Sequence, residues 1–329
     1  MTTTTQTSQM LPIHTLLPQA SRLIMGCMGL GGGWNAEPIS AADEHLAFSV
    51  IDTALESGIN FFDHADIYTF NKAEAVFGRY LKQFPAQRQQ LYIQSKCAIK
   101  LAQPGQTGQY DCSKQYILDA VNGTLARLET DYLDLLLLHR PDPLMQAEEV
   151  AAAFDVLTQQ GKVRHFGVSN MGWAQMQLLQ SQLSQPLRVN QLEMSLAAHH
   201  WLEEGVLIGM PAGAERHFGY GTLEYCQLNK VQLQSWGSLA QGRFSPSFAG
   251  QTQTEQAVSQ VVQQLAAEYQ CSSEAILLAW LMRHPAAIQP VIGSTNLQRI
   301  RACAAAPVIM LTREHWYQLY VAARGAALP

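Results

Sequence analysis

The sequence predicts an α/β protein in which eight parallel strands and their helices close into a (β/α)8 TIM barrel. Eight short apolar runs alternate with longer amphipathic stretches, which is the pattern of such a barrel. The competing topology is an open, doubly wound sheet, but no G-x-G-x-x-G motif lies between a first strand and its helix. The glycine-rich stretch GCMGLGGG has the wrong spacing for that motif. The pattern also predicts an extra helix before the eighth strand and a C-terminal helix.

Length and composition fit one large domain and exclude several classes of protein. The chain has 329 residues, of which 47% are apolar and 14% charged, so a large core can be buried. The net charge of −5 and the lack of a basic stripe argue against a nucleic-acid partner. The six cysteines are scattered, which favours free thiols over a disulfide framework. No apolar run is long enough to span a membrane and no signal peptide is recognisable, so we expect a cytoplasmic protein.

The first half of the chain supplies four of the expected strands. We expect residues 1–20 to be a flexible tail and residues 21–329 to be a single domain. The strands are expected at 22–26, 59–65, 91–96 and 132–140. The last of these is nearly all apolar, as a parallel strand buried on both faces should be. The amphipathic stretches between the strands predict helices at 43–58, 73–84 and 113–130.

The second half repeats the pattern, with two additions. Strands are expected at 162–170, 187–195, 228–237 and 288–294. Helices are expected at 147–161, 173–183, 274–284 and from residue 296. The additions are the extra helix at 254–270 and the C-terminal helix at 311–325. A longer irregular region separates the sixth and seventh strands.

Polar side chains follow the apolar runs at several expected strand ends, where barrels keep their active sites. Asp63 ends the second strand, Tyr68 lies in the following loop, Lys96 ends the third strand and His139 the fourth. Any one of them could be a cap or a loop anchor. However, a lysine that closes a buried strand is costly unless it is paired, and Asp63 on the neighbouring strand is a possible partner. The set is therefore more informative than any member.

The chemistry expected of this set is proton donation to a carbonyl oxygen. A free tyrosine holds its proton tightly at neutral pH, and we expect the nearby ammonium of Lys96 to lower the pKa of Tyr68. Asp63 would hold Lys96 in place, and His139 could orient the carbonyl or share in proton delivery. A proton donor without a nucleophile suits hydride addition to a carbonyl. The hydride must come from a cofactor, because no side chain supplies one.

At these residues the sequence resembles the aldo-keto reductase superfamily, and it looks closest to the bacterial YdhF-like oxidoreductases. The resemblance covers nearly the whole chain. Its motifs are GINFFDHADIY, QSKC, LDLLLLHRPDPLM, GKVRHFGVSN, VNQLEMS, QSWGSLAQGR and VIGSTNLQRIR. It implies an NADPH-dependent reductase of aldehydes or ketones with the catalytic tetrad Asp63, Tyr68, Lys96 and His139. Tyr68 would be the acid.

The resemblance also implies where NADPH would bind. Ser169, Asn170 and Gln191 would hydrogen-bond the nicotinamide carboxamide, and Trp236 would stack on the ring. A second group of residues would contact the rest of the cofactor: Gly26, Gly237, Ser238, Leu239, Gln241, Arg243, Gly293, Ser294, Thr295 and Arg299. A guanidinium at Arg299 beside the ribose 2′-phosphate would favour NADPH over NADH. The alternative for this arginine is a solvated charge on the last barrel helix.

One residue and one pair of residues depart from the family's pattern. His64 stands where many relatives have threonine, and it either shapes the substrate pocket or packs in the core. Ala302 and Cys303 stand where many relatives carry a Glu-Asn pair for the adenine. The second departure leaves the adenine contacts undefined.

About fifteen residues, 206–220, are inserted after the sixth strand relative to the family's pattern. The insertion is glycine-rich and contains a proline, which predicts a loop. We hypothesise that it is a lid that adds Met210, His217 or Phe218 to the substrate site. A tolerated surface loop is the alternative.

The same residues allow three other functions. Lys96 could form a Schiff base as in a class I aldolase, but Tyr68 would then have no role. Asp63, His64 and His139 could bind a divalent ion, yet neighbouring residues on a strand point in opposite directions, so we predict no metal site. A regulatory or redox-sensing barrel subunit that binds NADPH with little turnover is the main alternative. We expect a small carbonyl compound as partner, without predicting its identity or the oligomeric state.

Overall fold

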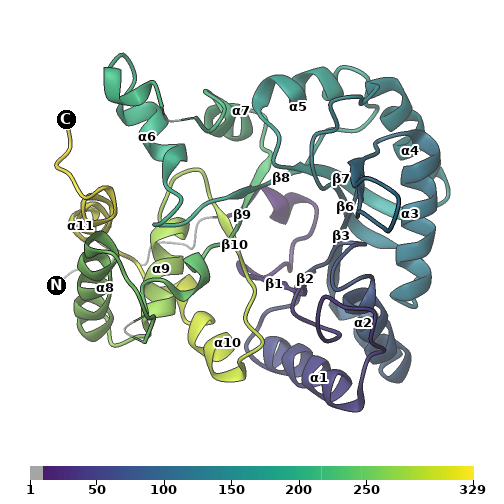
Figure 1. Ribbon diagram of the computed structural model, residues 1–329, viewed down its shortest axis with the longest axis horizontal. Coiled ribbons are helices and arrows are strands. Elements are labelled where there is room, and N and C mark those ends of the chain that lie inside the picture. Colours follow the sequence, from purple (N-terminus) through teal and green to yellow (C-terminus); the bar gives the residue numbers. More distant parts are fainter. Residues whose placement is uncertain (1–9, 216, 246) are drawn as a thin grey trace.

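The computed structural model describes residues 10–215, 217–245 and 247–329. These residues form a closed barrel of eight parallel strands (Figure 1). In order around the barrel, the strands are β1 (Ile24–Gly26), β10 (Gln289–Ile292), β9 (Gln232–Trp236), β8 (Val189–Glu193), β7 (Val163–Ser169), β6 (Leu133–Leu138), β3 (Tyr92–Cys97) and β2 (Phe61–Asp63). The predicted barrel is confirmed.

Helices surround the barrel between successive strands. The first five are α1 (Ala41–Glu56), α2 (Lys72–Gln83), α3 (Lys114–Arg127), α4 (Ala147–Gln159) and α5 (Trp173–Gln180). The predicted extra helix is α8 (Gln253–Glu268), which precedes α9 (Ser273–Met282) and β10. The last helices are α10 (Leu297–Cys303) and the predicted C-terminal helix, α11 (Arg313–Arg324). Among the described helices, none is both long enough and apolar enough to cross a membrane.

Serine and threonine side chains fix where several helices begin. Their hydroxyl oxygens accept a hydrogen bond from the third backbone N–H of the helix, which would otherwise have no partner. The N-caps of α1, α8, α9 and α11 are Ser40, Thr252, Ser272 and Thr312. Short 3-10 helices occur at Pro12–Thr15, Pro85–Gln90, Pro211–Gly213, Ala240–Gly242 and Ala306–Val308.

The chain before β1 packs against the base of the barrel, contrary to the expectation of a flexible tail up to residue 20. Leu11 and Ile13 are each 1% exposed, and they belong to one apolar cluster with Phe61 and Val189 of the barrel. The prediction is therefore wrong for residues 11–20, because burying these apolar side chains is more favourable than leaving them in water. Residues 1–9 lie outside the described ranges.

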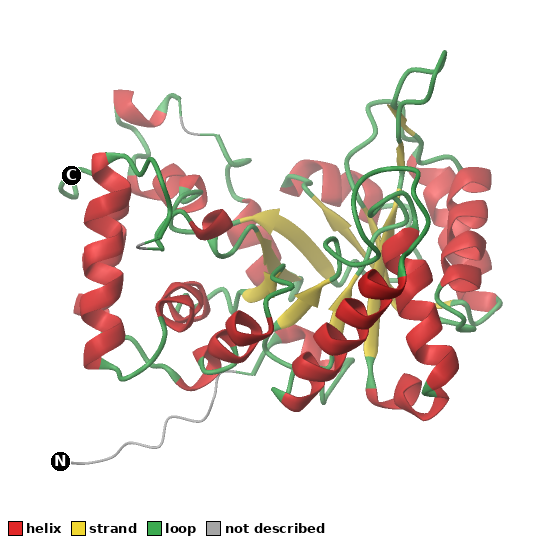
Figure 2. Ribbon diagram, turned by 60° about the horizontal axis from the view of Figure 1, so that its bottom comes forward, coloured by secondary structure: helices red, strands yellow, loops and turns green. Residues whose placement is uncertain are grey.

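Two segments at the opposite end of the barrel contain structure that the sequence did not predict. After β3, β4 (Ile99–Lys100) and β5 (Gln109–Tyr110) form an antiparallel hairpin that projects upward in Figure 2. After β8, the helices α6 (His200–Val206) and α7 (Thr222–Leu228) flank the insertion. Both segments follow strand ends, so they belong to the end of the barrel where active sites lie.

Candidate active site

The four residues of the predicted tetrad lie together where β2, β3 and β6 end. The Nζ of Lys96 lies 2.7 Å from each carboxylate oxygen of Asp63 and 3.0 Å from the Oη of Tyr68. The rings of His139 and Tyr68 meet edge to face, with centroids 5.9 Å apart. The Lys96–Asp63 ion pair, the phenol of Tyr68 and the imidazole of His139 therefore lie next to one another.

Lys96 is a buried ammonium that is held by its neighbours. Its side chain is 1% exposed, and it also donates to the carbonyl oxygen of His64 at 3.0 Å. Burial acts to lower the pKa of Lys96, but Asp63 and Tyr68 outweigh burial and leave that pKa above its ordinary value. Lys96 thus stays charged at neutral pH, because its partners replace the lost water.

The pKa of Tyr68 differs from the expectation. Burial raises it above its ordinary value, and the opposing effect of Lys96 is smaller. The predicted net lowering by Lys96 is therefore wrong for the protein without ligands, because the prediction did not count the desolvation of a phenolate. Tyr68 holds its proton at neutral pH, and Lys96 is placed to stabilise the phenolate if the proton leaves.

The two histidines of the site have different surroundings. Burial, Lys96 and Arg140 hold the pKa of His139 well below its ordinary value, so its imidazole is neutral. His64 is fully buried, and its ring packs edge-on against Phe77 of α2 with centroids 4.7 Å apart. Of the two alternatives for His64, shaping the substrate pocket or packing in the core, the structure shows packing in the core. Among the described residues, no group of three His, Cys, Asp or Glu side chains could hold a metal ion.

The residues expected to bind the carboxamide lie beside the tetrad. Asn170, with a left-handed φ of 58°, directly follows β7. Its Nδ2 donates to the Oγ of Ser169 at 2.8 Å and to the carbonyl oxygen of His139 at 3.2 Å. Its Oδ1 accepts a hydrogen bond from the indole Nε1 of Trp236 at 3.0 Å. The ends of β6, β7 and β9 are thereby joined by one amide.

A network of glutamines inside the barrel was not predicted. The Nε2 of Gln94 donates to Asp63 at 2.6 Å and to Gln234 at 3.0 Å, and the Nε2 of Gln191 contacts the same two residues at 3.1 Å. Gln234 in turn donates to Gln289 at 3.3 Å. The available signal was a glutamine within each of the runs that form β3, β8 and β10, and two glutamines within β9. The network fixes the carboxylate of Asp63, because buried amides need partners.

The loops after β9 and β10 carry the other residues expected to bind the cofactor. Gly237 has a φ of 67°, so the turn after Trp236 favours glycine. Ser238 is buried and donates to the carbonyl oxygen of Ser235, while Leu239 and Gln241 follow in the same turn. Gly293, Ser294 and Thr295 form the connection to α10, and the Oγ of Ser294 accepts from the N–H of Asn296.

Two guanidinium groups lie in this region on neighbouring elements. The side chains of Arg243 and Arg299 are each 51% exposed, with Glu255 at 3.6 Å and Glu274 at 3.9 Å as their nearest carboxylates. Such loosely paired cations are available to an anionic ligand. The amide of Asn170 fits a carboxamide, and the indole of Trp236 fits a nicotinamide ring. The guanidinium groups of Arg243 and Arg299 fit phosphates. Together these groups suit a nicotinamide dinucleotide phosphate.

Gly26 and Cys303 have structural explanations of their own. Gly26 lies inside β1, where a Cβ atom would come within 3.0 Å of Val291 and 3.1 Å of the carbonyl oxygen of Ile292. Close packing with β10 therefore accounts for this glycine. Cys303 is buried in the core, and the carbonyl oxygen of Ala302 accepts a hydrogen bond from Ser272.

The insertion is anchored at its end. The backbone N–H of Phe218 donates to Glu204 of α6 at 2.7 Å, and Phe218 packs against the core. Met210 is 41% exposed. The Oγ of Thr222 accepts from the N–H of Trp173 at the start of α5. A role as a lid stays a hypothesis.

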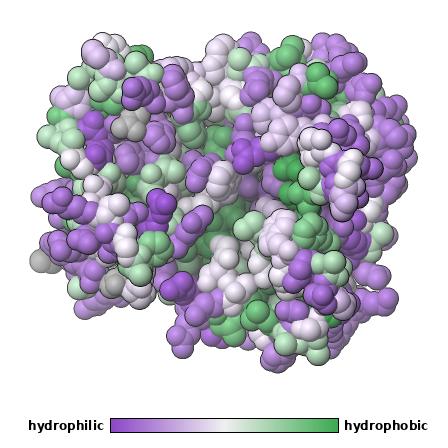
Figure 3. Space-filling view, viewed as in Figure 1, coloured by the Kyte–Doolittle hydropathy of each residue, from purple (hydrophilic) through white to green (hydrophobic). Residues whose placement is uncertain are grey.

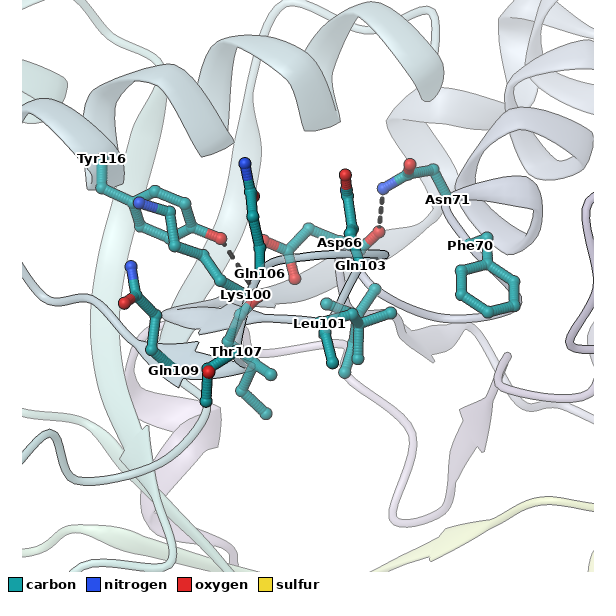
Figure 4. Close-up of a pocket in the computed structure, with 13 residues that line it drawn as sticks. Asp66, Phe70, Asn71, Lys100, Leu101, Gln103, Gln106, Thr107, Gln109 and Tyr116 are labelled. Carbon is teal, nitrogen blue, oxygen red and sulfur yellow. Dashed lines mark hydrogen bonds between the residues drawn. The ribbon is translucent and has the colours of Figure 1, made fainter.

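The mouth of the barrel faces the viewer in Figure 3, which shows hydrophobic side chains in a hollow near the centre. A pocket of about 590 Å³ lies between residues 66–71, the hairpin at 99–109 and Tyr116 (Figure 4). It is lined by Ile67 and Phe70, which flank Tyr68 in the chain. This pocket could not be predicted from the sequence, because most of its wall comes from a segment without hydrophobic periodicity.

Comparisons with known proteins show the family and the fold of the chain. The family model described as "Aldo/keto reductase family" matches residues 22–321. The chain is 38% identical to the oxidoreductase YdhF of Escherichia coli, covering 95% of this chain and 96% of the relative. It is 35% identical to a 6-dehydroglucose reductase of Agrobacterium fabrum, covering 93% and 95%. An aldo-keto reductase from Klebsiella pneumoniae in complex with NADPH has a similar fold, with a TM-score of 0.68 at 23% identity over 91% of this chain and 90% of that one.

Proposed function

The chain belongs to the aldo/keto reductase family, and we propose that it catalyses the NADPH-dependent reduction of an aldehyde or ketone. The observation that carries this proposal is the position of the Lys96 ammonium, 3.0 Å from the Tyr68 hydroxyl and 2.7 Å from both oxygens of Asp63. A phenol beside a held ammonium is a proton donor whose product anion is stabilised.

In the proposed mechanism, Tyr68 gives its proton to the carbonyl oxygen. The raised pKa of Tyr68 keeps the proton in place until negative charge develops on that oxygen. Lys96 then stabilises the phenolate at 3.0 Å, and Asp63 keeps Lys96 charged and oriented. The neutral imidazole of His139 holds the carbonyl oxygen by a hydrogen bond. The carbonyl carbon becomes a C–H and its oxygen an O–H.

NADPH, when bound, supplies the hydride that reaches the carbonyl carbon. Ser169, Asn170 and Gln191 would hold its carboxamide, and Trp236 would lie against its ring. The turns that begin at Gly237 and Gly293 would lie along its phosphates. Arg299, with 51% of its side chain exposed, supports a preference for NADPH over NADH because it can pair with a 2′-phosphate. The Klebsiella pneumoniae structure with NADPH gives further support.

The name of one relative suggests a carbonyl-bearing sugar as a candidate substrate. The relative from Agrobacterium fabrum is named a 6-dehydroglucose reductase. That compound carries an aldehyde at the end of a hydroxylated chain, and its reduction gives glucose. We therefore include 6-dehydroglucose among the aldehydes to be tested.

The proposal is tested by Tyr68→Phe, which removes the proton donor and keeps the ring. We expect kcat for a panel of aldehydes to fall about 10²- to 10⁴-fold, as for loss of a general acid. The Kd for NADPH, measured by fluorescence titration, should stay within about twofold. Tyr92→Phe, at the opposite end of β3, is the matched control. A Tyr68→Phe variant with near-normal turnover would refute the role of Tyr68.

The same experiment separates a reductase from the alternative, a regulatory subunit that binds NADPH with little turnover. A reductase oxidises NADPH in the presence of an aldehyde, and the rate depends on Tyr68. Tight NADPH binding without turnover of any aldehyde in the panel would favour the regulatory subunit.

A further inference from the structure

A buried glutamine next to the Lys96–Asp63 ion pair has no role in the proposed mechanism. Gln94 of β3 is 0% exposed, and it lies directly opposite Asp63 in the pairing of β3 with β2. Lys96 follows Gln94 by two residues, so their side chains leave β3 on the same face. The side chains of Gln94, Lys96 and Asp63 therefore share the inner face of the barrel.

The hydrogen bonds fix the orientation of the Gln94 amide. Its Nε2 lies 2.6 Å from the Oδ1 of Asp63 and 3.0 Å from the Oε1 of Gln234. The opposite orientation would place the Oε1 of Gln94 against the carboxylate, where two acceptors repel each other. With the nitrogen on Asp63, the Oε1 of Gln94 is buried and has no hydrogen-bond partner among the described residues. The donor reaches Asp63 only with the acceptor of the same amide left unpaired.

This unpaired oxygen argues against a purely structural role for Gln94. A buried acceptor without a partner is unfavourable, because it has lost its hydrogen bonds to water. An apolar side chain at this position would leave no neighbour unpaired, since Gln191 also donates to Asp63 and to Gln234, at 3.1 Å each. Lys96 donates to both carboxylate oxygens as well. The fold does not need the amide of Gln94, so its action on Asp63 is the explanation that remains.

The charge of Asp63 matters because Asp63 and Tyr68 share the ammonium of Lys96. The Nζ of Lys96 lies 2.7 Å from each oxygen of Asp63 and 3.0 Å from the Oη of Tyr68. After burial, which has the largest effect, Lys96 lowers the pKa of Tyr68 and Asp63 raises it. A further donor on the carboxylate disperses its negative charge. Less of that charge then opposes the stabilisation of a phenolate by Lys96.

We propose that Gln94 is a positioning residue of the reductase. It holds the carboxylate of Asp63 and takes up part of its negative charge, so that Lys96 stabilises the oxygen of Tyr68 as the proton leaves. This role rests on the proposed function, because it acts on the proton transfer from Tyr68. Gln191 contacts the same carboxylate, but it would also hold the carboxamide of NADPH. Gln94 keeps its hydrogen bond to Asp63 whether or not the cofactor is bound.

The first test measures catalysis and stability in Gln94→Met, a change that keeps the length of the side chain and removes its donor. With 4-nitrobenzaldehyde and NADPH, kcat should fall about tenfold, the effect of one hydrogen bond to a charged group. KM and the Kd for NADPH should stay within about twofold, since Gln94 touches neither ligand. The equilibrium constant of unfolding, obtained from urea titration, should stay the same or fall because an unpaired oxygen is removed.

The matched control is Gln232→Met, which makes the same change at a glutamine of β9 away from Asp63. Gln232 is also 0% exposed, but its amide is paired at both ends. It donates to the carbonyl oxygen of Ala287 at 2.7 Å and accepts from the N–H of Ile13 at 3.4 Å. Gln232→Met should keep the wild-type kcat and raise the equilibrium constant of unfolding about tenfold, because it leaves buried groups unpaired.

The second test asks whether Gln94 acts through Tyr68, by adding Gln94→Met to Tyr68→Phe. In the residual turnover of Tyr68→Phe, the second change should alter kcat less than about twofold, because no phenolate is left to stabilise. A further tenfold loss would overturn the proposal. An unchanged kcat in Gln94→Met alone, or unfolding as easy as that of Gln232→Met, would also overturn it.

The outcome in the wild type separates this proposal from the proposed function. A wild type that oxidises NADPH with none of the aldehydes tested would refute the reductase function, and the role of Gln94 with it. A wild type whose turnover Gln94→Met leaves unchanged would refute the role of Gln94 alone.

Discussion

Burial, more than neighbouring charge, sets the protonation of the side chains around Tyr68. It raises the pKa of Tyr68 despite an ammonium 3.0 Å away, and it lowers the pKa of His139. It also raises the pKa of Asp66 to about 7, an effect to which Glu74 adds and which Arg127 reduces. The reason is the same in each case, since the charged form loses its water. The sequence indicates which charged groups act on a side chain, but the net direction of its pKa shift also depends on how far the fold excludes water.

The pKa of Asp66 predicts a pH dependence of stability. An unfolded aspartate has a pKa near 4, so the folded protein binds this proton more tightly. The resulting stabilisation is complete below about pH 4 and is lost as the pH rises through about 7. Besides Glu74 and Arg127, Lys96 acts on Asp66 and lowers its pKa. Asp66 in turn raises the pKa of Tyr116.

We expect the wild type to lose roughly 3 kcal/mol more of its free energy of unfolding between pH 5 and pH 8 than Asp66→Asn does. Urea unfolding of both proteins at the two pH values measures this difference. The control is Asp131→Asn, at an exposed position, which should follow the wild type. Parallel curves for the wild type and Asp66→Asn would contradict the prediction.

At the scale of elements, the helix before the insertion is tied to the last helix of the chain. Glu203 of α6 accepts hydrogen bonds from Tyr320 and Arg324 of α11, with Arg324 Nε at 2.6 Å. The side chains of Glu203 and Arg324 are only 4% and 8% exposed. The C-terminal helix thereby holds α6, from which the insertion leaves the barrel.

We expect Arg324→Ala to lower the free energy of unfolding by about 3 kcal/mol, because it leaves the carboxylate of Glu203 buried without its cation. It should also increase the amide hydrogen exchange of α6. Urea unfolding and exchange mass spectrometry measure the two effects. Arg301→Ala removes an exposed pair with Glu56 and should cost less than about 1 kcal/mol. Similar losses of unfolding free energy in both variants would show that the buried pair contributes no more to stability than the exposed pair.

The strand positions could be predicted from the sequence, whereas the hairpin and the short helices could not. An apolar run such as that of β6 identifies a buried strand by itself. The hairpin at 99–110 is mostly polar with two glycines, and its strands have two residues each, so neither a strand period nor apolar content marks it. The helices α6 and α7 have seven residues each, about two turns, which is too short for a clear helical period. The secondary structure of such short segments depends on their tertiary contacts.

The same division applies to the candidate site. The positions of Asp63, Lys96 and His139 followed from the ends of apolar runs, and the structure brings them together with Tyr68. Their catalytic roles stay predictions. The glutamine network and the pocket around Asp66 could not be predicted, because both depend on which side chains of distant segments share one space.

At the scale of the whole molecule, the barrel is closed at one end by its own N-terminal segment. Leu11 and Ile13 pack with residues at the starts of β1 and β2, Ile24 and Phe61. Gln94, Gln191 and Gln234 of the glutamine network lie further along their strands, whereas Gln289 begins β10. The tetrad lies where β2, β3 and β6 end. The base thus combines apolar packing with two buried glutamines, since Gln232 accepts from the N–H of Ile13 at 3.4 Å and Gln289 donates to the carbonyl oxygen of Ser21 at 2.7 Å.

We expect Ile13→Ala to lower the free energy of unfolding by about 2–4 kcal/mol, the usual cost of removing a buried isoleucine side chain. Urea or thermal unfolding measures the loss. Met10→Ala, at a position 73% exposed, should stay within about 0.5 kcal/mol of the wild type. A loss below 0.5 kcal/mol for Ile13→Ala would show that the segment adds little to the barrel.

The packing of this segment also decides how the protein could be fixed to a solid support. Met10 is solvent-exposed at the base, while Cys27, Cys97, Cys112, Cys226 and Cys303 are buried. Cys271 is half-buried, so it would first be replaced by serine. A maleimide surface would then react with the thiol of Met10→Cys. Every tethered molecule would then turn the opposite end, with its hairpin, toward the flowing solution, as the two ends lie in Figure 2.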